Sequence, residues 1–295
     1  MLHRITTLIL LSLLLGACAT PMRVSLNSEQ RAKLGGLKAR VIVVQDEVIA
    51  AVQPSQVSVA TGGGLIGAMI DSSITNERVK ESQKLMGPFY ASIEDVDFRR
   101  EFNETITREL TRYPIKMGEV VTTPRMLTLA ELNQMRAELP PGHALLLIIP
   151  RYSLTMDFRT LDAEAFVTIW EKGEGNTPIQ RGVLSYQSKP VGTGGKMSME
   201  MWSADNAALF RSTLRESVTE LTNLILMDVD VVATPAKSDE MKTFSLNTGL
   251  QQGEIKGRSL KELANRVIVI GEDGKLYSLP KAQPAALAQR ERSAP

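Results

Sequence analysis

Hydrophobic positions recur with helical spacing after Ser92. Ser92 and Asp95 match a capping box, which marks a helix start. Every fourth residue that follows is apolar, and Pro114 ends the pattern. The pattern therefore predicts an amphipathic helix from Ser92 to the residues before Pro114, with a buried stripe of Phe98, Phe102, Ile106 and Leu110.

Two further helices are predicted downstream. Thr128 and Glu131 form a second capping box, and the short helix that follows is stopped by Pro140. Its inner side carries Leu132, Met135 and Leu139. The longest helix is expected over about 204–227. Its apolar stripe consists of Phe210, Leu214, Val218, Leu221 and Ile225.

Other segments have the patterns of strands. Residues 40–44 form a short apolar run rich in β-branched side chains, as in a strand buried on both faces. Apolar and polar residues alternate over 143–158, 165–170 and 182–189, with short connections between them. These three strands predict an antiparallel meander. The fold class is therefore α+β: a mixed or antiparallel sheet whose three-strand meander is covered by helices, all within one domain over 39–232.

The C-terminal part is predicted as a small hairpin unit. The composition shifts to Thr, Pro, Ala, Lys and Ser after residue 232, which indicates a linker over 233–256. The unit over 257–280 would contain one or two helical turns at 259–265 and a hairpin that turns at 272–274. Residues 281–295 have the composition of a disordered tail.

The first 17 residues have the composition of a secretory signal. Arg4 precedes an apolar run over 5–15, which is shorter than the ~20 residues that span a bilayer. Small residues and Cys18, the only cysteine of the chain, follow. The motif Leu-Gly-Ala-Cys that ends at Cys18 resembles the lipobox of bacterial lipoproteins. An ordinary signal peptide with a chance cysteine is the alternative.

The lipobox resemblance implies a membrane anchor. In that family the chain is cut between the positions of Ala17 and Cys18, the thiol is joined to diacylglycerol, and the new amino group is acylated, for example with palmitate. Membrane lipid would then be a partner through Cys18, with residues 18–38 as a tether. The absence of an acidic residue at positions 19 and 20 resembles an outer-membrane address, with the domain facing the periplasm.

Charge and composition exclude several functions. Removing residues 1–17 leaves 33 basic and 33 acidic residues, which gives no surplus for binding nucleic acid. His143 is then the only histidine, so a Ser-His-acid triad could be built only there, and a zinc site lacks ligands. We therefore predict no catalytic residue, no metal and no cofactor, and the protein is expected not to be an enzyme.

The glycine-rich segment over 61–70 is unusual for a plain globular domain. Small residues recur every four positions around it, as in the close helix packing of membrane proteins. The segment resembles the glycine zippers of outer-membrane lipoproteins. A glycine-rich connection packed within the domain is one interpretation, and self-association or membrane contact is the other. The residues expected to form the contact are Gly63, Gly64, Gly67 and Ala68.

Three other motifs have simpler explanations. The stretch 192–196 fails the phosphate-loop pattern at Pro190 and Met197, so we expect a turn. Asp95 and Asp97 suit the first turn of a helix. Asp228 and Asp230 are expected at a solvated helix end, and His143 at a strand edge.

These observations favour an outer-membrane lipoprotein that acts by binding, in envelope maintenance or in the assembly of a secretion or surface structure. Its partner would be another envelope protein or a second copy of itself. One alternative is a homo-oligomeric ring or pore that uses the glycine-rich segment. The other is a cell-wall hydrolase that uses carboxylates, although only 5% of the residues are aromatic and sugar clefts commonly stack aromatic rings.

Overall fold

The computed structural model describes residues 23–45, 48–51, 80–111, 117–173, 175–230, 240–249 and 252–281. The predicted signal peptide, the glycine-rich segment and the predicted tail lie outside the described residues, apart from Lys281.

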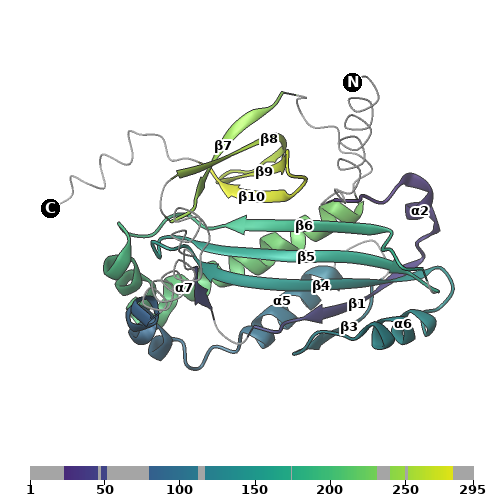
Figure 1. Ribbon diagram of the computed structural model, residues 1–295, viewed down its shortest axis with the longest axis horizontal. Coiled ribbons are helices and arrows are strands. Elements are labelled where there is room, and N and C mark those ends of the chain that lie inside the picture. Colours follow the sequence, from purple (N-terminus) through teal and green to yellow (C-terminus); the bar gives the residue numbers. More distant parts are fainter. Residues whose placement is uncertain are drawn as a thin grey trace, which may run out of the picture.

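Within these ranges, ten strands form one open mixed sheet (Figure 1). The order is β3-β1-β4-β5-β6-β10-β9-β8-β7, with β2 beside β4. The strands are β1 (Gly36–Ile42), β2 (Ile49–Ala50), β3 (Met117–Thr123), β4 (His143–Leu154), β5 (Leu161–Glu171), β6 (Gln180–Gln187), β7 (Lys242–Asn247), β8 (Gln252–Glu262), β9 (Arg266–Gly271) and β10 (Leu276–Pro280). β1 pairs in parallel with β3 and β4, β4-β5-β6 form the predicted antiparallel meander, and β10 joins β6 in parallel. The predicted α+β class is confirmed.

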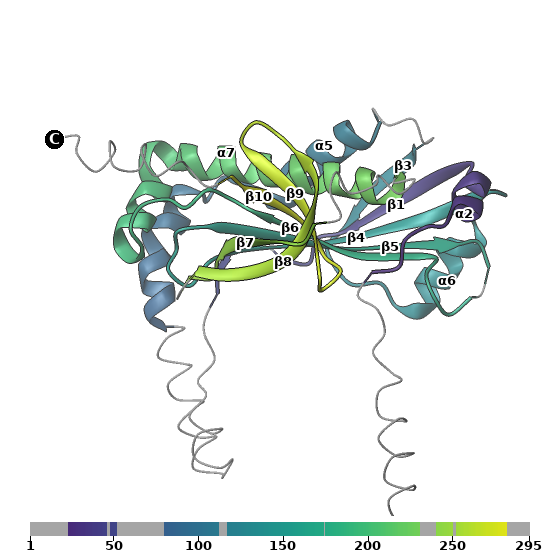
Figure 2. The ribbon, with the colours of Figure 1, turned by 90° about the horizontal axis from the view of Figure 1, so that it is seen from above.

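Helices cover one face of this sheet, which we call the helix face (Figure 2). α5 (Phe98–Thr111) packs against β3, and α7 (Gly195–Asp230) packs against β5, β6 and β10. Alternate residues of β4, β5 and β6 point into this layer and are buried in the main core. Their partners are the predicted helical stripes, including Phe102, Ile106, Leu110, Phe210, Leu214, Val218, Leu221 and Ile225, all nearly inaccessible to solvent.

The helix predicted to begin at Ser92 begins at Phe98, and a separate helix over 80–92 precedes it. The hydroxyl of Ser92 donates to the carbonyl of Phe89 in the last turn of this preceding helix. Asp97, one residue before α5, accepts from the backbone N–H of Arg100, as an N-cap residue does. The predicted capping box at Ser92 is therefore wrong, because that hydroxyl bonds backward along the chain.

The second capping box is confirmed. Thr128 accepts from the backbone N–H of Glu131, and the Glu131 carboxylate accepts from the backbone N–H of Thr128. α6 (Leu129–Ala137) follows. Its apolar side chains lie against a separate small cluster on the other face of the sheet.

The long helix has an unpredicted first part. α7 begins at Gly195 and changes direction at Ala204–Ala207, where Asp205, Asn206 and Ala207 have positive φ angles of 51°, 56° and 55°. Asp and Asn tolerate this region better than most side chains. The predicted helix corresponds to the part after the kink, while the stretch before it was expected only as a turn.

The structure also differs at the two ends of the predicted domain. Strands β7 and β8 lie where a linker and helical turns were expected, and β10 joins the hairpin unit to the main sheet. The β9-β10 hairpin itself is confirmed. The predicted tether over 18–38 contains the short helix α2 (Ser28–Lys33) and the start of β1. No helix within the described ranges is long and apolar enough to cross a membrane.

Candidate docking face of the sheet

The sheet face opposite α5 and α7 is only partly covered. At one end α6 packs on Leu145, Leu147 and Trp170. At the other end, β7 and β8 pack on β9 and β10 around Val269 and Tyr277. Figure 2 shows α6 and β7 on the side of the sheet away from α7. Figure 1 looks onto this face, and none of the described elements crosses the middle of β4, β5 and β6.

A row of apolar side chains crosses this uncovered region. The strand pairing aligns Ile149 with Phe166 and Phe166 with Val183, so the three lie side by side on β4, β5 and β6. All three remain partly exposed, and none belongs to or packs against the buried clusters of the described residues. We call these three residues and their surroundings the docking face. Apolar surface of this kind, bordered by polar groups, commonly marks an interaction site.

The sequence signal of this row is a run of adjacent apolar residues within an alternating strand. Ile148-Ile149, Phe166-Val167 and Val183-Leu184 each place one apolar side chain in the core and one on the docking face. A strand with a fully solvated face would carry a polar residue at the outward-facing position of each pair. Sequence reasoning missed the site because the pairing that aligns the three residues is not visible along the chain.

Charged side chains border the apolar row. Arg40 pairs with Leu147, on the side of the row toward α6, and Arg151 follows Ile149 by two residues on the other side. Partial burial lowers the pKa of Arg40, although the negative charge of Glu119 opposes this shift. The Nε atom of Arg40 is buried and has no hydrogen-bond partner within the described part of the chain. Arg40 and Arg151 therefore place one positive charge on each flank of the row.

One acidic residue on this border is already paired. Glu164 lies opposite Arg151 on β5, and its carboxylate accepts a 2.8 Å hydrogen bond from Nζ of Lys275. This ion pair links β5 to the turn before β10. It leaves the Arg151 guanidinium available to a ligand, since no contact of Arg151 with another described side chain is present.

A polar cluster lies where β7 meets the ends of β5 and β6. Gln187 donates to Asp162 at 2.9 Å and exchanges hydrogen bonds with the backbone of Asn247. Burial raises the pKa of Asp162 to about 7, and the charges of Asp157 and Glu164 act in the same direction, against the hydrogen bond from Gln187. The cluster fixes the β7 side of the docking face and holds a carboxyl group that titrates near neutral pH.

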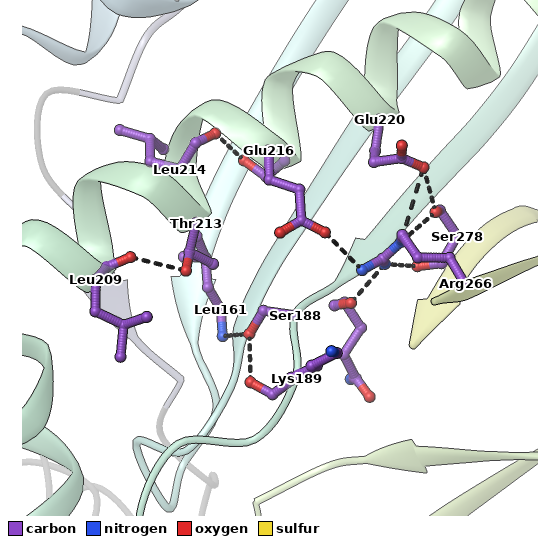
Figure 3. Close-up of polar contacts among 12 residues, drawn as sticks. Leu161, Ser188, Lys189, Leu209, Thr213, Leu214, Glu216, Glu220, Arg266 and Ser278 are labelled. Carbon is purple, nitrogen blue, oxygen red and sulfur yellow. Dashed lines mark hydrogen bonds and ion pairs between the residues drawn. The ribbon is translucent and has the colours of Figure 1, made fainter. Parts of the chain in front are cut away.

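A second cluster fastens the C-terminal strands to α7 (Figure 3). Arg266 of β9 is 2% exposed and lies 4.3 Å from the ring centroid of Tyr186. Its guanidinium donates to Glu216 of α7 at 3.1 Å and to Ser278 of β10 at 2.8 Å. Glu220, one turn further along α7, accepts from the Ser278 hydroxyl. These two glutamates neutralise a buried cation and hold β7–β10 in place.

A third cluster fastens the N-terminal segment. Asp228 is 1% exposed, accepts from Arg23 at 2.8 Å, and also accepts from Gln180. Burial raises the pKa of Asp228, and the charge of Arg23 opposes this effect. The expectation of a solvated helix end is therefore wrong for Asp228, because the chain before α2 returns to cover it.

The other predicted residues have ordinary surroundings or lie outside the described residues. His143 begins β4 and is partly exposed, with Nδ1 3.2 Å from the carbonyl oxygen of Pro141. Asp95 accepts from Arg211 at 2.6 Å, which lowers the pKa of Asp95. Outside the described residues lie the predicted processing and interaction positions Ala17, Cys18, Gly63, Gly64, Gly67 and Ala68.

Neither a search for metal sites nor comparison with known proteins assigns a function to these residues. In the described part of the chain, no group of three or more His, Cys, Asp or Glu residues is placed to hold a metal ion. No protein-family model matches the chain, and no curated protein matches its sequence.

Proposed function

We propose that this protein is a lipid-anchored protein of the outer membrane that acts by binding another envelope protein through the docking face. The observation that supports this proposal most strongly is the row of Ile149, Phe166 and Val183 between α6 and β7–β8. Among the described residues, helices cover the helix face, and the middle of the docking face has no described element across it. The proposal includes no catalytic step.

The ion pair of Arg23 limits how far the domain can lie from its proposed anchor. Arg23 is five positions after Cys18 in sequence, and an extended chain spans at most about 3.5 Å per residue. An acylated Cys18 would therefore hold Arg23 within roughly 18 Å of the lipid surface. Because Asp228 fixes Arg23 to α7, the end of the sheet near β6 would face the membrane.

Two acyl signals would make this attachment stable. One chain gives only marginal, reversible membrane binding, whereas two or more chains hold a protein on the bilayer. The docking face would then work at a fixed distance from the membrane, without a long tether. This arrangement suits a protein that holds a partner close to the inner surface of the outer membrane.

The experiment is site-specific photocrosslinking of the full-length protein in the cells that produce it. A photoreactive amino acid replaces Phe166 in one strain and Leu129 in a control strain; Leu129 is 69% exposed and lies on α6. We expect a discrete crosslinked protein species for position 166 and a much lower yield for position 129. Equal yields at both positions, or none at 166, would contradict binding through this face.

The anchor is tested separately by the mass of the mature N-terminus. We expect an acylated cysteine, and a Cys18→Ser variant that leaves the membrane fraction. An unmodified Cys18, or a variant that stays in the membrane fraction, would contradict the lipid anchor but not the docking face. The ring or pore and the hydrolase remain alternatives, and no contact among the described residues favours either.

A further inference from the structure

Arg40 has an unfilled hydrogen-bonding position next to the apolar row. Its Nε is buried without a hydrogen-bond acceptor in the described part of the chain, and its guanidinium is partly desolvated. Leaving a buried donor unsatisfied costs about 1–3 kcal/mol, so native proteins usually provide an acceptor. Because Nε itself is buried, a bound partner would meet Arg40 at the partly exposed remainder of its side chain, where a carboxylate supplies the opposite charge.

The positions of Arg40 and Arg151 define where such carboxylates would lie. Arg40 is in register with Leu147, Ile149 follows two residues later, and Arg151 two residues after that. Two residues along a strand span about 7 Å, so a cation stands about 7 Å to each side of the apolar row. Glu164, the acid opposite Arg151, is already held by Lys275, and Glu119 acts on Arg40 as a nearby negative charge.

From this arrangement, and resting on the proposed function, we infer that the partner presents an acidic, apolar protein segment to the docking face. Its apolar side chains lie over Ile149, Phe166 and Val183, and its carboxylates point to Arg40 on one flank and to Arg151 on the other. Planar guanidinium groups bind carboxylates with two parallel hydrogen bonds, which fixes the orientation of the segment. The segment therefore carries acidic residues on both sides of an apolar stripe.

The length of the row limits the size of the segment. Three adjacent strands, β4, β5 and β6, carry Ile149, Phe166 and Val183 in register. With about 4.8 Å between strands, the row is roughly 10 Å long. A helical segment of about 7 residues, or an extended one of about 3, would cover it.

Two other occupants fit less well. A second copy meeting this face through two-fold symmetry would bring Arg40 and Arg151 toward the same arginines of its partner, and like charges in contact are unfavourable. A flat lipid surface would reach the row poorly, because α6 and β7–β8 stand on either side of it. Both occupants are possible outcomes of the experiment below.

The test identifies what is crosslinked to the photoreactive residue at position 166. After crosslinking in cells, the adduct is purified and its attached peptide is sequenced by mass spectrometry. We expect a peptide from another protein with a net negative charge and apolar side chains. A neutral or basic peptide, a peptide of this same chain, or a lipid adduct would overturn the inference.

Charge reversal provides an independent measurement. Arg40→Glu combined with Arg151→Glu should lower the crosslinking yield about tenfold, the effect of losing roughly 1.4 kcal/mol of binding free energy. The pair Arg40→Lys with Arg151→Lys keeps the charge but loses the paired hydrogen bonds, so its yield should lie between those of the parent protein and the charge-reversed variant. As a control with the same change in net charge, Arg100→Glu with Lys196→Glu alters exposed positions on α5 and on the first part of α7.

The outcomes separate this inference from the proposed function. A strong crosslink at position 166 that is insensitive to reversal of the two arginines would overturn the acidic partner and leave binding through the face intact. The absence of any specific crosslink at position 166 would overturn both. A yield that falls equally in the control variant would show a general charge effect and would also overturn the inference.

Discussion

Nε of Arg23 donates to Oδ1 of Asp228 at 2.8 Å, and this bond joins residues 205 positions apart. It fixes the first described residue of the chain to the last turn of α7. Asp228 is buried, so removal of Arg23 would leave its charge without the main opposing partner. Arg23→Met should therefore destabilise the fold by about 3 kcal/mol, the typical effect of breaking a buried ion pair.

The measurement is urea unfolding followed by the fluorescence of Trp170 and Trp202. Trp202 is fully buried and donates from its ring nitrogen to the carbonyl of Phe158 at 2.7 Å, so its part of the emission reports the intact core. The double variant Arg23→Met with Asp228→Asn should recover part of the lost stability, because the uncompensated charge is gone. A single variant as stable as the parent protein would contradict the role given to this pair.

Patterning along the chain predicted the elements whose stability depends on local sequence. The meander β4-β5-β6, the stripe of α7 after its kink, and the box of Thr128 and Glu131 follow from periodicity and capping. Strands β7 and β8 were missed because their charged and glycine-rich sequence resembles a linker. Their stability comes from pairing with each other and with β9, in a register that the residue pattern does not show.

The docking face could not be located for the same reason. Ile149, Phe166 and Val183 are ordinary strand residues in the sequence, and only the pairing of three strands brings them together. Asp228 was read as solvated because nothing near it in sequence indicates Arg23. Long-range partners of this kind decide which polar residues are buried, and periodicity carries no information about them.

The buried cluster around Arg266 should control the stability of the C-terminal strands. Arg266→Met removes the hydrogen bonds to Glu216 and Ser278 and leaves Glu220, whose side chain is 13% exposed, without the charge of Arg266. We expect a loss of about 3–5 kcal/mol, the range for breaking a buried ion pair. Hydrogen exchange by mass spectrometry should show faster exchange of β9 and β10, while the amides of α5 change less.

A triple variant serves as the control for this cluster. Adding Glu216→Gln and Glu220→Gln to Arg266→Met removes the unpaired carboxylates together with the cation. Part of the lost stability should return, since replacing every member of a buried ionic group costs less than removing one. A triple variant less stable than the single variant would contradict this electrostatic explanation.

The raised pKa of Asp162 predicts a dependence of stability on pH. The folded-state pKa is about 7, while an unfolded aspartate has a pKa of about 3.9. Below about pH 4 the carboxyl is protonated in both states, and its contribution to stability is fully present. As the pH rises from about 4 through 7, the unfolded state ionises first and stability falls, by about 2–4 kcal/mol in total.

Asp162→Asn should remove this dependence and keep the hydrogen bond from Gln187, because an amide oxygen also accepts. The variant should be more stable than the parent protein at pH 8 and similar at pH 4, measured by urea unfolding at both values. Glu131→Gln is a control whose pH dependence has the opposite sign. The Arg125 hydrogen bond lowers the pKa of Glu131 to about 2, so the contribution of Glu131 to stability is lost as the pH falls. If the difference in free energy of unfolding between the parent protein and Asp162→Asn were the same at both pH values, the raised pKa of Asp162 would be refuted.

Two phenylalanines on opposite sides of the sheet should respond differently to truncation. Phe102 of α5 is 1% exposed and contacts Tyr152 in the core, whereas Phe166 on β5 is partly exposed on the docking face. Phe102→Ala should cost about 3–5 kcal/mol, as for other buried aromatic side chains. Phe166→Ala should cost less, about 2 kcal/mol, because part of its ring is already exposed to solvent in the unbound protein.

The order should reverse for capture of the partner in cells. Crosslinking from a photoreactive residue at Val183 should fall strongly in Phe166→Ala, although that variant stays folded. If Phe166→Ala destabilised the protein as much as Phe102→Ala, position 166 would be part of the core and the face would not be available for docking.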